Sequence, residues 1–502
     1  MVGQAGRLTV ETRAGLVEGT TTPTARGPVC VWRGLRYADA ERFRAPRPPA
    51  RWTGLRPAVA FGPSCPQMIP GISRPLGTWE AHDDAACLVL NVLSHAADEA
   101  RRPVMVWIHG GAFVLGSADM YDCAHFAASG EIVVVTINYR LGVLGFLDLG
   151  GALGEPELES NLGLRDQIAA LRWVRDNIAA FGGDPDRVTI AGESAGSVAV
   201  SMLMVCPEAA GLFHGAIMQS GALTIAHEAP RARALAARFL TLLGLPSPTL
   251  RTLQALPVQR ILRAQHALQA ETEGRLPALP WFDGTLLPES LDAARQAATP
   301  PVPLLAGFNR DEYRSFELLP EGRSGSRRNH LARVLRAAIG TSAAQRILDA
   351  YPDNRRANQQ LATDLYFAMP TLNFAARHAA HGACWFYRFD IAHPLLKAGH
   401  GLDLLYLFNI DGLLATLLRG GRLAGPRAAL AQRMRRHWLG FVRDGRPGPG
   451  WPGFAEPERS TLLFNRVDQV AHDPEAPRRL AWSGRDVVSG AVAHADPASA
   501  AG

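Results

Sequence analysis

The chain has few cysteines and almost no lysine. Its 502 residues include only 6 cysteines, and none of them has Cys-x-x-Cys spacing. We therefore expect neither a disulfide scaffold nor a zinc site. Lys397 is the only lysine, so the net charge of +6 comes from arginine. Because the arginines are interspersed with Asp and Glu, the sequence does not indicate a nucleic-acid-binding surface.

Long apolar runs are also missing. No run approaches the roughly 18 to 20 residues that a membrane-spanning helix needs. A signal peptide has a charged region followed by an apolar stretch, and residues 1–7 lack this arrangement. We therefore expect a cytoplasmic protein without a membrane span. The alternative is a secreted or periplasmic protein whose signal peptide has been removed.

The hydrophobic residues that are present, 47% of the chain, suffice for a large core. Short, nearly continuous apolar runs are typical of parallel strands covered on both faces. Between two such runs, residues 163–180 have apolar side chains at intervals of three or four, which predicts a helix. This alternation predicts the α/β class, with a mostly parallel sheet flanked by helices. The apolar runs are residues 104–108, 132–137, 188–190, 215–218, 302–306 and 384–389.

No repeat or low-complexity linker divides the chain. Because α/β enzymes often run long as one domain with insertions, we predict a single domain over residues 1–490. Segments 222–300 and 314–380 are rich in Ala, Leu and Arg at helical spacing, and we expect them to be helical insertions that cap the sheet. Residues 491–502 are predicted to be a disordered tail.

The pentapeptide Gly192-Glu193-Ser194-Ala195-Gly196 lies between a β-branched run and a helix-like segment. A G-x-S-x-G sequence in that setting is typical of the nucleophile elbow of an α/β-hydrolase. The two glycines allow the strand and the helix to approach closely. The pattern therefore predicts the α/β-hydrolase fold, with Ser194 as a nucleophile.

A serine nucleophile needs an imidazole to take its proton and a carboxylate to orient that imidazole. In this fold both follow the serine along the chain, on loops after later strands. The loop after one late strand offers Asp311 and Glu312, and the residues alone do not choose between them. The loop after the next offers His400, which glycines flank, and His393 as the alternative.

Residues 109–113, His-Gly-Gly-Ala-Phe, follow another apolar run. Small residues expose their N–H groups, as in the loop that supplies part of the oxyanion hole of esterases and lipases. A phosphate-binding loop is the alternative, but neither glycine pattern of such loops is present here.

Further motifs lie on both sides of the elbow. They are residues 61–67 (FGPSCPQ), 87–92 (CLVLNV), 138–142 (NYRLG), 181–185 (FGGDP) and 219–221 (QSG). From about residue 8 to residue 465 the chain resembles the type-B carboxylesterases, which include cholinesterases and bacterial para-nitrobenzyl esterases. The resemblance implies a serine carboxylesterase that acts on small-molecule esters, without a metal or organic cofactor, as a monomer or homodimer.

The resemblance also implies roles for individual residues. It assigns the catalytic triad to Ser194, Glu312 and His400. It assigns the oxyanion-hole N–H groups to Gly111, Ala112 and Ala195.

The resemblance also identifies residues around the triad. Ser220 matches a serine that supports the acid, and Glu193 lies beside the nucleophile. Cys65 and Cys87 match the family's first disulfide, although both would stay reduced in the cytosol. Tyr313 stands where the family has a glycine after the acid.

Substrate specificity is expected to depend on the two insertions and on aromatic residues. Phe113, Trp281 and Phe282 are the candidates for lining an apolar pocket, with core packing as the alternative for each.

Two other kinds of function are compatible with these sequence features. Some members of this fold family are binding proteins that have lost catalytic residues. An amidase, a carbamate hydrolase or an acyltransferase would use the same triad on a different bond.

Overall fold

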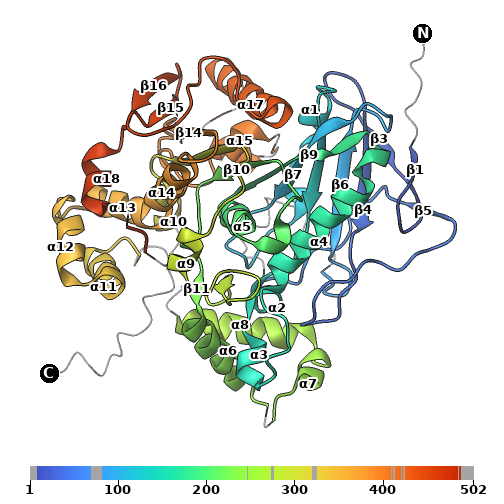
Figure 1. Ribbon diagram of the computed structural model, residues 1–502, viewed down its shortest axis with the longest axis horizontal. Coiled ribbons are helices and arrows are strands. Elements are labelled where there is room, and N and C mark those ends of the chain that lie inside the picture. Colours follow the sequence, from blue (N-terminus) through green and yellow to red (C-terminus); the bar gives the residue numbers. More distant parts are fainter. Residues whose placement is uncertain are drawn as a thin grey trace.

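The centre of the fold is a mixed sheet of 11 strands (Figure 1). The computed structural model describes residues 8–68, 82–245, 247–272, 276–318, 325–408, 410, 413–419, 421, 424–483 and 485–487. In spatial order the strands are β16 (Gln469–His472), β15 (Ser460–Phe464), β14 (Cys384–Phe389), β13 (Leu304–Asn309), β10 (Gly215–Gln219), β9 (Gly183–Glu193), β7 (Arg102–Ile108), β8 (Val133–Ile137), β6 (Val89–Ser94), β4 (Val29–Arg36) and β3 (Thr20–Thr22).

Parallel pairing dominates the middle of this sheet. Six of its ten strand pairings are parallel, from β8 through β15, and the four antiparallel ones lie at its two ends. All six apolar runs contribute to these central strands. The predicted α/β-hydrolase class is confirmed. The antiparallel strands at the ends of the sheet were not predicted, because their apolar runs are short or interrupted by polar residues.

The core forms because successive side chains of a strand point to opposite faces of the sheet. In β7, Val104 and Val106 contribute to one apolar cluster, and Met105 and Trp107 contribute to another. Residues of α4 (Leu162–Asn177) and α5 (Ala195–Met204) complete the first cluster, and residues of α17 (Pro426–Asp444) complete the second. The sheet is therefore covered on both faces, which explains why its central strands are almost wholly apolar.

The two segments expected to be insertions are largely helical. In Figure 1, α6, α7 and α8 gather at the bottom of the molecule and α11 and α12 at the left. The first segment holds β11 (His227–Glu228), α6 (Ala229–Leu243), α7 (Leu250–Gln254), α8 (Val258–Glu271), β12 (Trp281–Phe282) and α9 (Leu291–Gln296). The second segment begins at the second residue of α10 (Tyr313–Glu317). It also holds α11 (Arg328–Ile339), α12 (Thr341–Asp349), α13 (Arg355–Thr363), the π-helix η6 (Asp364–Ala368) and α14 (Met369–His378).

Smaller elements complete the described part of the chain. The single-domain organisation stays a prediction, and the predicted tail at residues 491–502 lies outside the described residues. Within the described ranges, no helix has the length and apolarity needed to cross a membrane. The remaining elements are β1 (Thr9–Glu11), β2 (Leu16–Glu18), β5 (Leu55–Pro57), η2 (Ala118–Met120), α1 (Ala124–Ala127), α2 (Gly142–Phe146), α3 (Leu149–Leu153), η3 (Ile178–Phe181), η4 (Pro207–Ala209), α15 (Leu404–Leu407), α16 (Leu413–Leu418) and α18 (Ala476–Trp482).

A buried ion pair ties the segment after β8 to α4. Arg140 donates from Nε and Nη2 to the two carboxylate oxygens of Asp166, at 2.8 and 2.7 Å. Both side chains are almost completely buried. The backbone N–H of Arg140 also donates to Asp166, at 3.0 Å, and Nη1 donates to the carbonyl of Arg44, at 2.7 Å. Each charge therefore has its partners within the core, as burial demands.

Replacing Arg140 with methionine leaves the Asp166 carboxylate buried without its counter-charge. We expect Arg140→Met to lower the free energy of unfolding by about 3–5 kcal/mol. The control is Arg172→Met, which removes a half-exposed ion pair with Glu208 from the same helix and should cost less than about 1 kcal/mol. Urea denaturation measures both, and equal losses in the two variants would contradict the expectation.

Candidate active site

Ser194 lies on a strained turn between β9 and α5. Its backbone angles are φ 56° and ψ −121°, a region that costs energy for a residue with a side chain. The flanking glycines allow this turn because there is no room for a Cβ atom at either one. A Cβ on Gly192 would lie 2.5 Å from the carbonyl carbon of Gly196, and one on Gly196 would lie 2.1 Å from the oxygen of Ile108. The predicted strand, elbow and helix are therefore all present.

The loop after β7 lies against this turn. A Cβ on Gly110 would be 3.2 Å from the Cβ of Ser194. Gly111, Ala112 and Phe113 all have positive φ angles, of 109°, 57° and 60°. The fold of the loop is fixed by hydrogen bonds from Leu115 N to Gly111 O, at 3.0 Å, and from Gly142 N to Phe113 O, at 2.6 Å.

Three backbone donors near Ser194 have no acceptor. The N–H groups of Gly111, Ala112 and Ala195 donate no hydrogen bond to any residue that the structure describes. Ala195 also begins α5, and the N-terminus of a helix favours negative charge. These are the same three donors that the resemblance assigns to an oxyanion hole.

Glu312 and His400 meet at the carboxyl ends of two neighbouring parallel strands, β13 and β14. The Nδ1 atom of His400 lies 2.6 Å from Oε2 of Glu312. The other carboxylate oxygen of Glu312 accepts a hydrogen bond from Asn309 N at 2.7 Å. Glu312 is completely buried, so its orientation is fixed by these two contacts.

The alternative acid and base point elsewhere. Asp311 pairs with the guanidinium of Arg310 at 3.0 Å and accepts from Ala398 N at 3.1 Å. The ring of His393 is bonded to the backbone of its own loop and to the carbonyl of Leu417. Of the candidates left open by the sequence, the structure therefore pairs Glu312 with His400.

The other ring nitrogen of His400 faces a second carboxylate. Its Nε2 atom lies 3.3 Å from Oε1 of Glu193, whose side chain is buried. Within the described part of the chain, the Ser194 hydroxyl forms no hydrogen bond with His400. The structure thus brings the predicted base and acid together but leaves the serine and the base without a direct bond.

Burial and mutual charge set the protonation of this group. Burial raises the pKa of Glu193, and although the His400 charge opposes the shift, the pKa reaches about 8. Burial alone would lower the pKa of His400, but Glu193 and Glu312 together raise it to about 9. A proton on the imidazole is therefore stabilised from both sides.

A third carboxylate, Asp403, is fully buried below the pair. It accepts hydrogen bonds from Gln219 Nε2 at 2.8 Å, Tyr387 OH at 3.1 Å and Asn309 Nδ2 at 3.1 Å. Burial raises its pKa, and the negative charge of Glu312 adds to the shift. Asp403 therefore connects the strand ends on which the site is built.

Two phenylalanine rings that the sequence did not single out contact His400. The ring centres of Phe316 and Phe367 lie 5.0 and 4.7 Å from that of the imidazole. Phe316 stands four residues after Glu312, about one helical turn along α10, and this spacing is the signal that could have found it. Nothing in the local sequence connects Phe367, which lies on η6, to His400.

The aromatic residues predicted to line a pocket lie in the core. Phe113 and Phe282 have no exposed surface, and Trp281 is buried. Phe113 packs against Phe146 with ring centres 4.9 Å apart. Their burial favours apolar packing, the stated alternative, and a role in lining a substrate pocket stays a prediction for all three.

Two further contacts differ from what the resemblance implies. The Ser220 hydroxyl is buried without a hydrogen-bond partner in the described structure, so it does not support Glu312 here. The N–H of Asn309 supplies that support. Cys65 and Cys87 are free thiols, and the Cys87 thiol donates to the carbonyl of Asp84 at 3.9 Å.

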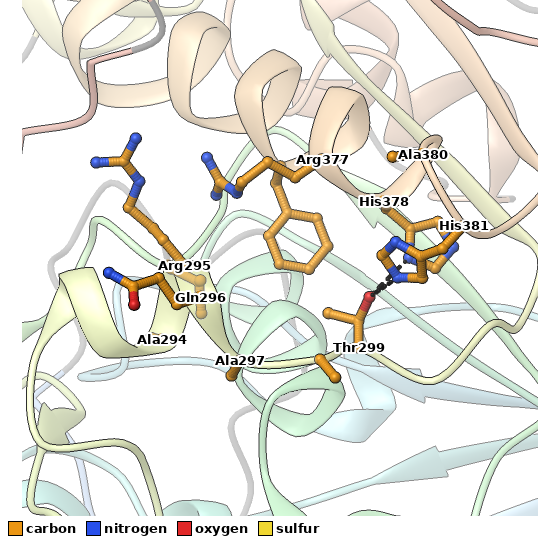
Figure 2. A pocket seen from close by; sticks show the side chains of 12 residues that line it. Ala294, Arg295, Gln296, Ala297, Thr299, Arg377, His378, Ala380 and His381 are labelled. Atoms are coloured by element: carbon orange, nitrogen blue, oxygen red, sulfur yellow. Dashed lines mark hydrogen bonds between the residues drawn. The ribbon is translucent and has the colours of Figure 1, made fainter.

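A cavity of about 430 Å³ lies away from these residues, between the end of α9 and α14. Figure 2 shows Arg295 and Arg377 on one side of it and His378, Thr299 and His381 on the other. The Thr299 hydroxyl lies 3.0 and 2.7 Å from the two imidazoles. None of the triad candidates lines this cavity, so it is not the catalytic pocket. Over the described ranges, no group of three or more His, Cys, Asp or Glu side chains could hold a metal ion.

Comparison with known proteins identifies the family. Residues 6–479 match the Carboxylesterase family. The para-nitrobenzyl esterase of Bacillus subtilis (strain 168) is 37% identical over 488 residues, which cover 94% of this chain and 97% of that protein. The phenmedipham hydrolase of Pseudarthrobacter oxydans is 32% identical over 478 residues, covering 89% and 94%.

Solved structures show the same relationship. A PNB esterase superposes with a TM-score of 0.87 at 35% identity, covering 95% of this chain and 99% of that one. A carboxylesterase of Geobacillus stearothermophilus at pH 6.2 gives a TM-score of 0.83 at 36% identity, covering 95% and 100%. The chain therefore belongs to the carboxylesterase family, as a type-B serine carboxylesterase.

Proposed function

We propose that this enzyme hydrolyses carboxylic esters through an acyl-enzyme intermediate on Ser194, with His400 as the base and Glu312 as the acid. The observation that carries the proposal is the 2.6 Å bond between His400 and Glu312, beside a serine on a strained elbow. A buried carboxylate on Nδ1 fixes the tautomer in which Nε2 can accept a proton.

In the first step, Ser194 Oγ attacks the ester carbonyl while His400 Nε2 takes the hydroxyl proton. The oxygen of the tetrahedral intermediate carries the negative charge and accepts hydrogen bonds from Gly111, Ala112 and Ala195, whose N–H groups donate to no other residue in the described ranges. His400 then gives the proton to the leaving alcohol. The serine ester is hydrolysed by water that the same imidazole activates.

For this step, Nε2 must reach Ser194 rather than Glu193, which it faces in the structure. Catalytic hydrogen bonds of this kind are often long or poorly aligned until substrate is bound. We assign Glu193 an electrostatic role. Its carboxyl group favours the protonated form of His400. That form exists after His400 takes the serine proton and before it gives the proton to the leaving alcohol.

The relatives named above support small-molecule esters as the substrates. For the compartment we propose the cytoplasm, which the neighbouring Cys65 and Cys87 thiols support because such pairs stay reduced there. A monomer or a homodimer stays our proposal for the assembly.

Removing the nucleophile tests the proposed function. We expect Ser194→Ala to lower kcat on para-nitrophenyl esters, from acetate to long acyl chains, by roughly 10⁴-fold or more. Ser201→Ala removes a buried hydroxyl of α5, the helix that follows Ser194. This hydroxyl donates to Val198 O, so the variant should keep its activity. Full activity of Ser194→Ala would overturn the proposal.

The pH dependence of kcat/KM tests the role of Glu193. His400 acts as a base only when neutral, so kcat/KM should rise with pH through the His400 pKa of about 9. Glu193→Gln removes a negative charge beside Nε2. Because that charge stabilises the protonated imidazole, we expect the midpoint to move down by about 1 pH unit or more.

Asp311→Asn is the matched control, since the Asp311 carboxylate faces Arg310 rather than His400. Its pH profile should match that of the wild type. A midpoint that stays in place or moves up in Glu193→Gln would contradict the electrostatic role.

A further inference from the structure

A column of four aromatic rings ends on His400. We define the aromatic column as Tyr366, Tyr313, Phe316 and Phe367. Tyr313 stacks on Tyr366, with ring centres 5.6 Å apart and planes at 25°. It also contacts Phe316, at 5.5 Å. Phe316 in turn stacks on Phe367, at 5.6 Å and 12°, and these two phenyl rings both contact the imidazole.

The column joins two elements. Tyr313 and Phe316 belong to α10, and Tyr366 and Phe367 are consecutive residues of the π-helix η6. The N–H of Tyr313 also donates to Thr363 Oγ1, directly before η6, at 3.1 Å. Single-turn π-helices occur frequently at functional sites. Here each of two successive η6 residues contacts a ring of α10.

Tyr313 joins the two elements at the end of the column away from His400. It follows Glu312 directly in the chain and is 9% exposed. It contacts Phe316 of α10 and Tyr366 of η6. Removing its side chain would leave a void between the two elements and would free both phenyl rings to shift.

The imidazole needs such a support. The Nδ1 bond to Glu312 fixes one point of the ring, but one hydrogen bond does not by itself fix the tilt of the ring plane. The two phenyl rings at 5.0 and 4.7 Å limit this rotation by contact. Nε2 must point at the serine for proton transfer, and a misplacement of about 1 Å at a reacting group can cost roughly 10²-fold in rate.

We propose that Tyr313 is a positioning residue for ester hydrolysis. Its ring ties α10 to η6 and so holds Phe316 and Phe367 against His400, which fixes the plane in which Nε2 moves the proton. The inference rests on the proposed function, because it needs His400 as the base.

The test compares three variants, Tyr313→Phe, Tyr313→Leu and Tyr313→Ala, with para-nitrophenyl acetate as the substrate. Tyr313→Phe keeps the ring and should keep kcat. Tyr313→Leu keeps apolar volume but loses the flat faces, and should lower kcat by a smaller factor than Tyr313→Ala. For Tyr313→Ala we expect a fall of about 10- to 100-fold in kcat, with KM nearly unchanged.

A matched control separates positioning from general stability. Phe454 is buried and packs on Phe386 with ring centres 5.2 Å apart, and its N–H bonds to Cys384 at the amino end of β14, opposite to the end near His400. Phe454→Leu should lower the melting temperature as much as Tyr313→Leu does, without lowering kcat.

The outcomes are distinct. The inference is overturned if folded Tyr313→Leu and Tyr313→Ala keep the wild-type kcat, if KM carries the loss, or if Phe454→Leu loses as much kcat. Ser194→Ala is measured beside them. If Ser194→Ala loses activity while the Tyr313 variants keep full activity, only the positioning role is overturned. If Ser194→Ala keeps its activity, the proposed function itself is overturned.

Discussion

The imidazole of His400 lies between two carboxyl groups, and the architecture of the site follows from that contact. Glu312 holds Nδ1 at 2.6 Å, and Glu193 lies 3.3 Å from Nε2. The three residues come from segments that are far apart in the sequence, and they meet because β9, β13 and β14 run parallel with only β10 between the first two. In parallel α/β sheets, functional groups gather at the carboxyl ends of the strands. The large sheet therefore serves as the rigid support for one short hydrogen bond.

Three buried carboxyl groups share this site with one imidazole. Glu193, Glu312 and Asp403 are all buried, and His400 is the cation that can form among them. Burying several carboxylates is costly, and this cost raises the pKa of Glu193 and of Asp403. The same negative field stabilises an imidazolium. In the proposed mechanism His400 becomes an imidazolium in each half of the reaction. The carboxyl groups around it therefore favour the transfer of a proton to His400.

Much of this site could be predicted from the sequence, because acyl-transfer chemistry fixes both residue types and order. Ser194 stands out by its two glycines, which the packing of α5 on β9 requires. The residues alone left Asp311 open as an alternative to Glu312, and His393 as an alternative to His400. The family resemblance selects Glu312 and His400, and the 2.6 Å contact between them agrees with that choice. The fold class was predictable for a similar reason, since strands buried on both faces leave continuous apolar runs.

The walls of the site could not be predicted in the same way. Phe367 contacts His400 through packing between elements that no local pattern connects. Phe113, Trp281 and Phe282 are candidate pocket residues because they are aromatic, but an aromatic side chain serves a core equally well, and all three are buried. Ser220 depends on a hydroxyl orientation that the sequence does not encode, and the N–H of Asn309 fills the expected position instead.

The central claim is that His400 bonds to Glu312 and that neighbouring carboxylates raise its pKa. Proton NMR of the imidazole Nδ1–H, which a strong hydrogen bond moves far downfield, tests this directly. We expect a downfield signal that titrates with a midpoint near pH 9. The signal should be absent in His400→Ala and should be lost or moved in Glu312→Gln. A midpoint near 6.5, the ordinary value for histidine, or a signal unaffected by Glu312→Gln, would contradict it.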